Sequence, residues 1–437
     1  MAFLVAFFAF LLGRTVANII MPSESIYLIA DDILFHTKLC LFISLLSLFF
    51  FYGVNEKVRF NCGLRNGFFK EPYKGIEYYD ETHISIRMAS KYGLYATYIF
   101  AVIVAIEKIV FVSAFGYSQY YILYASSLPY LVSKMGDAFQ VCFFMYLATM
   151  PNRNEAKIPV VMYLFLALLA LAAGRRADFV VPVLLIILYC FTRNLINNNG
   201  ETWLTRRHLM IALMLSPFLL GYLFLRGAVR FTGGSALSGD ISLISQVVNF
   251  FNELGFSANV ISFGKMYENQ IPNKIYSFGE TIDYLRENII TQMFFDFPIY
   301  RSQTVERAMN SHNFTQIITY IRDPRFYLSG RGLGSSYIAE AYHDFGYVGV
   351  VLWNAFYAFL LSHFYNYKGK GIIYVAMSLC VLKAVLIAPR NVASGFLTQL
   401  INLDTWLIIG LICIMARVLR GKNFLYMKPA TKKDVSK

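Results

Sequence analysis

The chain has 437 residues, of which 57% are hydrophobic and only 15% are charged. A soluble domain carries about 25% charged residues, so this composition excludes an ordinary soluble protein and indicates a chain surrounded mostly by lipid. The net charge is +13. Because the basic residues stand mainly in short segments beside apolar runs, we attribute this charge to membrane topology and expect no nucleic-acid partner.

Ten apolar runs approach the roughly 20 residues that a membrane-spanning helix needs. In chain order they are 1–20, 34–54, 92–111, 127–149, 158–174, 178–193, 209–225, 347–364, 371–388 and 397–416. The first run lacks a basic leader and a clear cleavage site, so we expect it to be a retained span. We therefore predict an all-α, polytopic membrane protein with about ten transmembrane helices.

The fourth run is the weakest, because Lys134, Asp137 and Gln140 interrupt it. Ionisable groups at membrane depth usually face protein or water, and Lys134 and Asp137 are spaced so that they can pair. A functional role and a structural role are equally compatible with this pattern.

Basic residues in the loops predict the orientation of the chain. The tail 417–437 is rich in lysine and arginine, which places it in the cytoplasm. Counting back along the spans makes the N-terminus, the loop 55–91 and three shorter basic segments cytoplasmic as well; these segments are 151–157, 194–208 and 365–370. The predicted domains are then a first bundle with seven spans, a large outer loop, three last spans and the tail, at 1–225, 226–346, 347–416 and 417–437.

The long segment 226–346 faces the periplasm in this arrangement. Stretches 243–268 and 279–296 have the apolar spacing of helices, and glycine or Pro-Asn pairs mark turns between them. We expect this periplasmic loop to be a partly helical cap over the outer face of the membrane.

Several arginines stand at outer ends of the expected spans, where basic residues are disfavoured. Arg175 and Arg176 form a hairpin tip, Arg226 and Arg230 follow the seventh span, and Arg390 precedes the tenth. Because the guanidinium fork fits phosphate oxygens, the set predicts a site for a lipid pyrophosphate. The alternative is that these arginines reach lipid headgroups independently of one another.

Acidic residues of the long loop, and His343 beside them, are candidates for a general base, which the transfer of a sugar to a hydroxyl needs. Glu280 with Asp283, and Glu340 with Asp344, are the two pairs, and Glu340 and Asp344 share one face if their segment is helical. The alternative is that they solvate the loop or pair with its arginines. No histidine pair has metal-ligand spacing and no cysteine lies in the long loop, so we predict no metal and no cofactor.

Glycines at 330, 332 and 334 precede a predicted helix that runs toward the eighth span. Glycine lets a backbone approach a ligand closely, and a helix start favours an anion. A plain turn between loop and span explains the cluster equally well.

Longer stretches resemble a known family. NELGFSANVISFGKMYENQIP at 252–272, IYSFGETIDYL at 275–285 and GLGSSYIAEAYHDFGYVG at 332–349 are similar to the outer-loop signature of Wzy-type O-antigen polysaccharide polymerases. The Gly-Arg-Arg turn at 174–176 also resembles the family's turn between two spans. The chain departs from the family in one respect: its outer-loop arginines are not followed by a glycine eleven positions later.

The resemblance implies a glycosyltransferase on the outer face of the bacterial inner membrane. It would move a growing glycan from undecaprenyl pyrophosphate to the non-reducing end of a new lipid-linked repeat unit, without a metal. Arg175, Arg176, Arg226 and Arg331 would hold the pyrophosphate and stabilise the leaving group. Glu340 or Asp344 would deprotonate the acceptor, and a Wzz-type co-polymerase would be a partner.

Two other functions remain open at this point. An O-antigen ligase would share the donor and the topology but would transfer the glycan to lipid A–core. A flippase for the same lipids would be no enzyme; transporters concentrate charge near the membrane midplane, whereas most unusual charge of this chain is at the outer surface.

Overall fold

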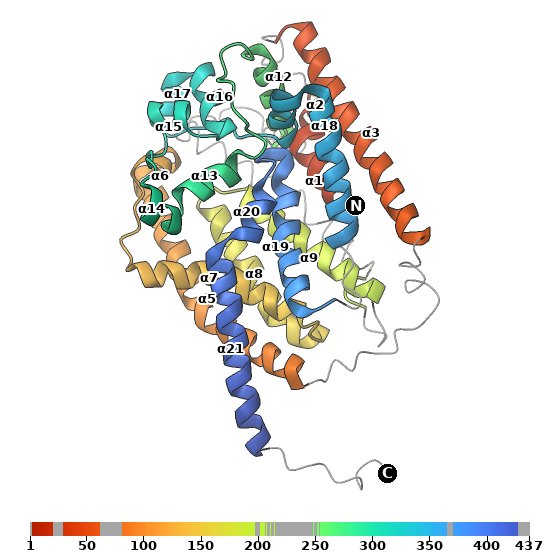
Figure 1. Cartoon of the computed structure of the whole chain (residues 1–437), viewed down its shortest axis with the longest axis vertical. Coiled ribbons are helices and arrows are strands. Elements are labelled where there is room, and N and C mark those ends of the chain that lie inside the picture. Colours follow the sequence, from red (N-terminus) through yellow and green to blue (C-terminus); the bar gives the residue numbers. More distant parts are fainter. Residues whose placement is uncertain are drawn as a thin grey trace.

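The computed structural model describes residues 2–20, 29–61, 81–196, 202–205, 254–364 and 370–426, with isolated positions between 207 and 252. Every regular element in these residues is a helix, which confirms the all-α prediction (Figure 1). The first half contains α1 (Ala2–Phe7), η1 (Phe8–Leu12), α2 (Gly13–Ile20), α3 (Asp31–Asn61), α5 (Glu81–Phe115), α6 (Tyr117–Leu123), α7 (Tyr130–Ala148), α8 (Arg153–Ala172) and α9 (Ala177–Ile196). The second half contains α12 (Ser257–Met266), α13 (Gly279–Glu287), α14 (Ile289–Phe295), α15 (Val305–Asn310), α16 (Phe314–Arg322), α17 (Pro324–Leu328), α18 (Tyr337–Phe364), α19 (Ile372–Ile387), η4 (Ala388–Arg390), α20 (Gly395–Ile401) and α21 (Leu403–Tyr426).

Six of the described helices are long and apolar enough to cross a membrane: α3, α5, α8, α9, α18 and α19 continued by η4. The pair α20 and α21, bent by 42°, is a seventh if it counts as one broken span. These helices coincide with seven of the ten expected runs. The N-terminal run forms only the shorter apolar stretch Ala2–Ala17, and the run 127–149 forms α7, which is not among the candidate spans. The run 209–225 lies almost entirely outside the described residues, so the count of ten stays a prediction.

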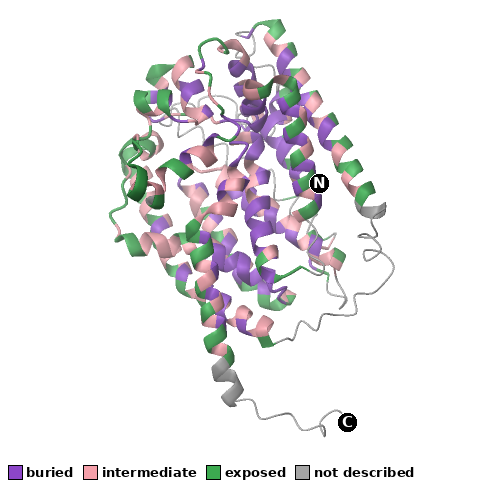
Figure 2. Ribbon diagram, in the orientation of Figure 1, coloured by how far each residue is buried: buried purple, intermediate pink, exposed green. Residues whose placement is uncertain are grey.

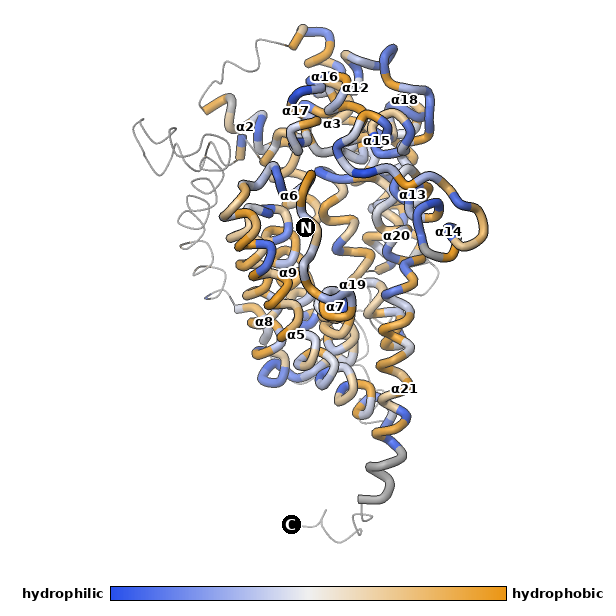
Figure 3. The backbone as a smooth tube through the Cα atoms, turned by 90° about the vertical axis from the view of Figure 1, so that its left-hand side faces the viewer, coloured by the Kyte–Doolittle hydropathy of each residue, from blue (hydrophilic) through white to orange (hydrophobic). Residues whose placement is uncertain are grey.

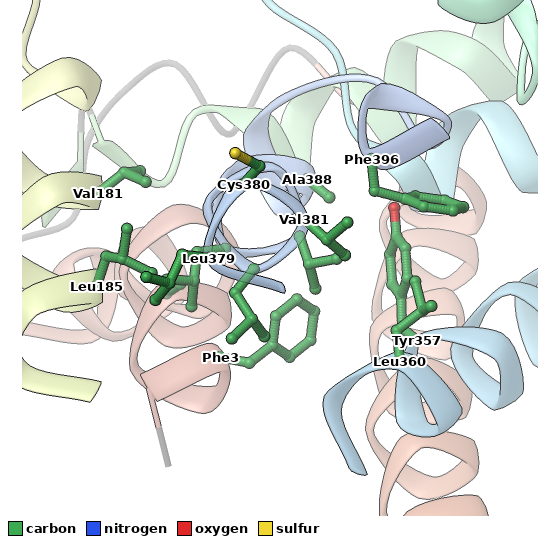
Figure 4. Packing of buried hydrophobic residues seen from close by; sticks show 14 of the residues in the cluster. Phe3, Val181, Leu185, Tyr357, Leu360, Leu379, Cys380, Val381, Ala388 and Phe396 are labelled. Atoms are coloured by element: carbon green, nitrogen blue, oxygen red, sulfur yellow. The ribbon is translucent and has the colours of Figure 1, made fainter. Parts of the chain in front are cut away.

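The helix α19 is the centre of the bundle. Its sequence is apolar on nearly every side, which is the pattern of a buried helix. Figure 4 shows Leu379 and Val381 of α19 between Phe3 of α1, Leu185 of α9 and Tyr357 of α18. Figure 2 shows the same concentration of buried residues along this helix. Side-chain packing around α19 therefore joins parts of the chain that are far apart in sequence.

Two further sets of helices complete the bundle. The helix α5 packs along α7 and α21, while α3 packs along α18. Lys134 of α7 forms an ion pair of 2.5 Å with Asp404 at the start of α21. The partner suggested by the sequence, Asp137, instead lines a cavity inside the bundle.

The element α18 consists of two helical arms that fold back on each other at Gly346. Gly346 has φ 62° and ψ −152°, a conformation that only glycine adopts readily. The hydroxyl of Tyr337 donates a hydrogen bond of 2.8 Å to the side-chain oxygen of Asn354. In a straight helix, residues separated by 17 positions would be roughly 25 Å apart along the axis.

Gly349 allows the two arms to come this close, because a Cβ there would lie 2.2 Å from the carbonyl oxygen of Ala341. The second arm, 347–364, is the predicted eighth span. The first arm, 337–345, returns into the protein and brings its carboxylates with it.

Residues 254–336 form the cap, a set of short helices that lies mainly at one end of the molecule (Figures 1 and 3). Local sequence explains the helix starts: Asn288, Thr304, Asn313 and Asp323 each accept a hydrogen bond from a backbone N–H in the first turn that follows. This described part of the expected loop is partly helical, as the apolar spacing predicted.

The cap is packed directly on the helices of the bundle. A Cβ at Gly255 would lie 2.5 Å from the backbone nitrogen of Arg14 in α2, so the two backbones touch. On the other side of the cap, Arg331 Nε donates to Ser118 Oγ in α6 at 3.2 Å. These contacts fix the cap relative to the bundle at widely separated points.

Candidate functional site

A cavity of about 280 Å³ lies inside the bundle, between α5, α7, α8, α9 and α19. Its walls are largely apolar, but five charged side chains also line it: Lys108, Asp137, Arg175, Asp178 and Lys383. Ionisable groups within membrane helices are unfavourable, and they commonly mark a site that binds or moves a charged ligand. The cavity is therefore the first candidate for a functional site.

The charges of the cavity favour an anion. Three cationic and two anionic side chains line it, which leaves a formal charge of +1. Lys383 of α19 donates a hydrogen bond to Gln140 Oε1 of α7 and so uses one of its three donor hydrogens. The other two donors can meet water or an anion in the cavity.

Arg175 stands where the cavity meets the end of the bundle. It lies in the turn between α8 and α9, and its Nε pairs with Asp178 Oδ2 at 2.5 Å. The two side chains are partly exposed, so this ion pair is weak and exchangeable. An anion entering the cavity can therefore compete with Asp178 for Arg175.

The short helix α6 brings together arginines that the sequence analysis placed in one site. A Cβ at Gly174 would lie 3.0 Å from the ring of Tyr117 in α6, so the turn carrying Arg175 and Arg176 packs on this helix. Arg331 of the cap bonds Ser118 of the same helix. Arg331 and the turn that carries Arg175 and Arg176 thus both contact α6.

Arg390 is separate from this group. Its Nη1 donates to the carbonyl oxygen of Leu254 at 2.9 Å, and its guanidinium lies 6.0 Å from the ring centre of Phe10. It is not among the residues that line the cavity. Arg226 and Arg230 lie outside the described residues, so their predicted part in the site stays a prediction.

Asp344 is engaged in holding the cap. Its buried carboxylate accepts hydrogen bonds from the backbone N–H of Tyr276 at 3.0 Å and from that of Ser277 at 2.7 Å. It also accepts from the hydroxyl of Ser277 at 2.6 Å, and His343 Nδ1 lies 3.2 Å away. Both oxygens of Asp344 thus accept hydrogen bonds from the protein, which is typical of a structural carboxylate.

Glu340 is similarly saturated and fully buried. Its Oε1 accepts from the hydroxyl of Ser335 at 2.6 Å, and its Oε2 accepts from the backbone N–H of Ala393 at 2.7 Å. The carboxylate therefore ties the first arm of α18 to the turn between η4 and α20. The helical spacing of Glu340 and Asp344 was predicted from the sequence, but their partners were not.

Glu280, at the start of α13, is a different case. Its Oε2 is buried and has no hydrogen-bond partner, and burial raises the pKa of the carboxyl group. A Cβ at Gly395 would lie 3.0 Å from that oxygen. The hydroxyls of Ser394 and Thr398, on either side of Gly395, are also buried without a partner. These groups form a small set of unused polar atoms beneath the cap.

The neighbouring carboxylate Asp283 has several partners. It accepts from the backbone N–H of His312 at 3.1 Å and lies 3.9 Å from the guanidinium of Arg307. Of the four carboxylates that the sequence put forward, Glu280 is thus the one with a buried oxygen that has no hydrogen-bond partner. In the part of the chain that the structure describes, no three His, Cys, Asp or Glu side chains could hold a metal ion.

Sequence reasoning missed Lys108 and Lys383, the two lysines of the cavity. Each lies inside an apolar run that was counted only as a span. A charged residue well inside such a run was the available signal, and it was used for Lys134 but not for these two.

The architecture defines a helical membrane protein with several spans, a net cationic cavity within its bundle and a cap packed on the helices. The chain belongs to the O-antigen polysaccharide polymerase Wzy family, whose model matches residues 1–423. No curated protein and no solved structure matches the chain. Family membership confirms the resemblance seen in the sequence, and it makes the protein a glycosyltransferase-like polymerase of polysaccharide biosynthesis that works in a membrane.

Proposed function

We propose that this polymerase transfers a growing glycan from undecaprenyl pyrophosphate to the non-reducing end of a lipid-linked repeat unit. The cationic cavity carries this proposal. A lipid diphosphate is an anion that stays at the membrane, and the cavity offers Lys108, Arg175 and Lys383 within the bundle. The family supports lipid-linked polysaccharide substrates in general, and the diphosphate carrier is our more specific assignment.

The reaction needs cations where the carrier leaves. The acceptor hydroxyl oxygen forms a bond to the anomeric carbon of the donor sugar, while the bond from that carbon to the diphosphate oxygen breaks. The bond electrons stay on the diphosphate, and the hydroxyl proton passes to a base. Lys383 and Arg175 would stabilise the charge that develops on the leaving diphosphate. Arg176 and Arg331, near α6, would hold the diphosphate or the adjacent sugar.

We assign the role of base to Glu280 before Glu340 or Asp344. A base needs an oxygen that is free to accept a proton, and both other carboxylates spend their oxygens on chain contacts. The buried environment raises the pKa of Glu280, which brings it closer to the range where a carboxylate accepts a proton well.

The membrane and the orientation of the chain are also part of the proposal. We propose the inner membrane of a bacterium, with both termini in the cytoplasm and with the cap and the cavity mouth on the periplasmic side. A Wzz-type chain-length co-polymerase is the partner that we expect, because chain length needs control by a second protein.

Reconstitution tests the function directly. The purified chain in liposomes should convert purified undecaprenyl-pyrophosphate repeat units into a ladder of longer glycans without added metal. An Arg176→Ala, Arg331→Ala double variant should make little or no ladder. A normal ladder from that variant would remove those two arginines from the site without affecting the polymerase assignment.

Deletion of the gene separates a polymerase from a ligase. Cells without a polymerase should still carry single repeat units on lipid A–core, whereas cells without a ligase should carry none. Vesicles that translocate the lipid without any lengthening of the glycan would instead indicate a flippase.

A further inference from the structure

The segment around α14 exposes large apolar side chains although it belongs to the cap. Met293 is 76% exposed, Phe294 75%, Phe295 66% and Ile299 64%. We call these four residues the α14 patch. A concentration of exposed aromatic and aliphatic side chains in one short segment marks a surface that contacts protein or membrane.

The polar side chains of α14 make hydrogen bonds within residues 286–297, while its large apolar side chains are exposed. Asn288 caps the helix by accepting from the backbone N–H of Ile290 at 2.9 Å and that of Thr291 at 3.1 Å. Gln292 Nε2 donates to the carbonyl oxygens of Arg286 at 2.9 Å and of Phe297 at 3.0 Å. A helix facing water would have the opposite arrangement, with polar groups outside and apolar groups inside.

The position of α14 points to lipid as the medium outside it. The helix follows α13 directly, and the backbone N–H of Leu403 at the start of α21 donates to Tyr284 Oη of α13 at 3.2 Å. Figures 1 and 3 agree in placing α14 at the height of α20, on the outside of α13. The α14 patch therefore lies beside the junction of α20 and α21, the bent pair that passes as one membrane span.

The outer surface of α21 below this junction has the composition of a lipid contact. Trp406 is 45% exposed and Leu407 61% exposed, within a helix that is apolar enough to cross the membrane. Tryptophan near a span end is characteristic of the membrane–water interface. Exposed apolar side chains therefore occur both on this span and on the cap segment that lies at the height of its bend.

We infer that the α14 patch inserts into the interfacial layer of the bilayer and anchors the cap at the membrane surface. The exposed Arg286 supports this placement, because its guanidinium lies 6.0 Å from the ring centre of Phe297 and is available to lipid phosphates. The inference rests on the membrane character of the protein and does not depend on the proposed transfer reaction.

Fluorescence quenching by brominated lipids tests the anchor. The full chain and its Phe294→Trp variant are reconstituted in vesicles of ordinary or brominated phosphatidylcholine, and the emission of the wild-type chain is subtracted. The variant should show blue-shifted added emission that brominated lipid strongly reduces. Glu306→Trp is the matched control, because Glu306 is an exposed residue on α15, which both Figures 1 and 3 place higher in the cap. Its added emission should stay at long wavelength and resist the bromine.

Three results would overturn the anchor. The first is added emission from Phe294→Trp that brominated lipid does not reduce and that has the wavelength of a water-exposed indole. The second is blue-shifted but unquenched emission, which would mean that protein covers the patch. The third is a spectrum that changes with the protein-to-lipid ratio, which would indicate contact between copies of the chain. An unfolding temperature equal to that of the wild-type chain shows that each variant is folded.

Discussion

Lys383 in α19 donates a hydrogen bond to the side-chain carbonyl oxygen of Gln140 in α7. Both residues line a cavity that Lys108 and Arg175 also line. The central helix of the bundle therefore presents a cation to a cavity between the helices. This arrangement lowers the stability of the fold, because a charge within a membrane bundle costs free energy. A ligand with negative charge would offset this cost.

Replacing Lys383 by methionine should abolish glycan lengthening without loss of stability. Removal of a cation aimed at the leaving group should lower the rate on the order of a hundredfold or more. The methionine variant should be at least as stable, because the substitution removes the charge of Lys383 from the bundle interior. Ladder formation and thermal unfolding in detergent measure the two effects. Lys134→Met is the control, since Lys134 pairs with Asp404 and does not line the cavity.

Asp178→Asn should make the cavity bind diphosphate more tightly. The substitution raises the formal charge of the cavity from +1 to +2 and releases Arg175 from its ion pair. Because that pair is partly exposed, we expect a modest effect, with inorganic pyrophosphate inhibiting at a roughly threefold lower concentration. Weaker inhibition, or none, would contradict diphosphate binding in this cavity.

Glu280→Gln should change how stability depends on pH. Burial raises the pKa of Glu280 in the folded chain above its value in the unfolded chain. The folded state therefore holds more protons between the two values, and stability falls as pH rises through this window. Glutamine removes that loss, so the variant should gain thermal stability over the wild type as pH rises and should match it in acid.

The same variant should lose transfer activity if Glu280 is the base. Glu306→Gln, on an exposed position of α15, should change neither stability nor activity. A stability difference that is constant with pH would contradict the buried, titrating state of Glu280.

Asp344→Asn distinguishes a structural role from a catalytic one. The carboxylate binds two backbone N–H groups and one hydroxyl, so its replacement should cost about 3 kcal/mol of unfolding free energy. Chemical unfolding in detergent measures this loss. Activity per folded molecule should persist; a stable but inactive variant would restore the role of base that the sequence suggested.

Gly346→Ala should destabilise the fold of α18. The backbone conformation of Gly346 is strained for any other residue, although the space around it is open, so the cost should be about 1–3 kcal/mol. Thermal unfolding gives the magnitude. Gly371→Ala is the control, because Gly371 has open space and an ordinary extended backbone.

The sequence predicted the helices better than their contacts. The length of the apolar runs located α3, α5, α8, α9 and α19, because whether a helix can cross a membrane depends mainly on how many consecutive apolar residues it has. The same criterion located the eighth span at 347–364, the second arm of α18, but it could not show that the backbone conformation of Gly346 turns the preceding arm back into the protein.

The candidate site was only partly accessible from the sequence for a similar reason. The family signature and the basic span ends led to Arg175, Arg176 and Arg331, and the structure brings Arg331 and the turn of the other two to α6. Apart from the nearby Ser335 and His343, the partners of Glu340 and Asp344 lie 53 and 67 or 68 positions away, so no local pattern could have shown how fully these carboxylates are bonded. Lys383 interrupts an apolar run, but its place in a cavity became visible only when α19 was assembled with four other helices.

The cap contacts the helices at three places: Gly255 with α2, Arg331 with α6, and Ser277 with Asp344 of α18. These contacts have a consequence for how substrates reach the site. A cap held at three such places would not open as a lid. Substrates would instead enter and leave sideways, between elements that stay where they are. A glycan that lengthens by one repeat unit per cycle could then leave along a fixed path, without a rearrangement of the cap at each addition.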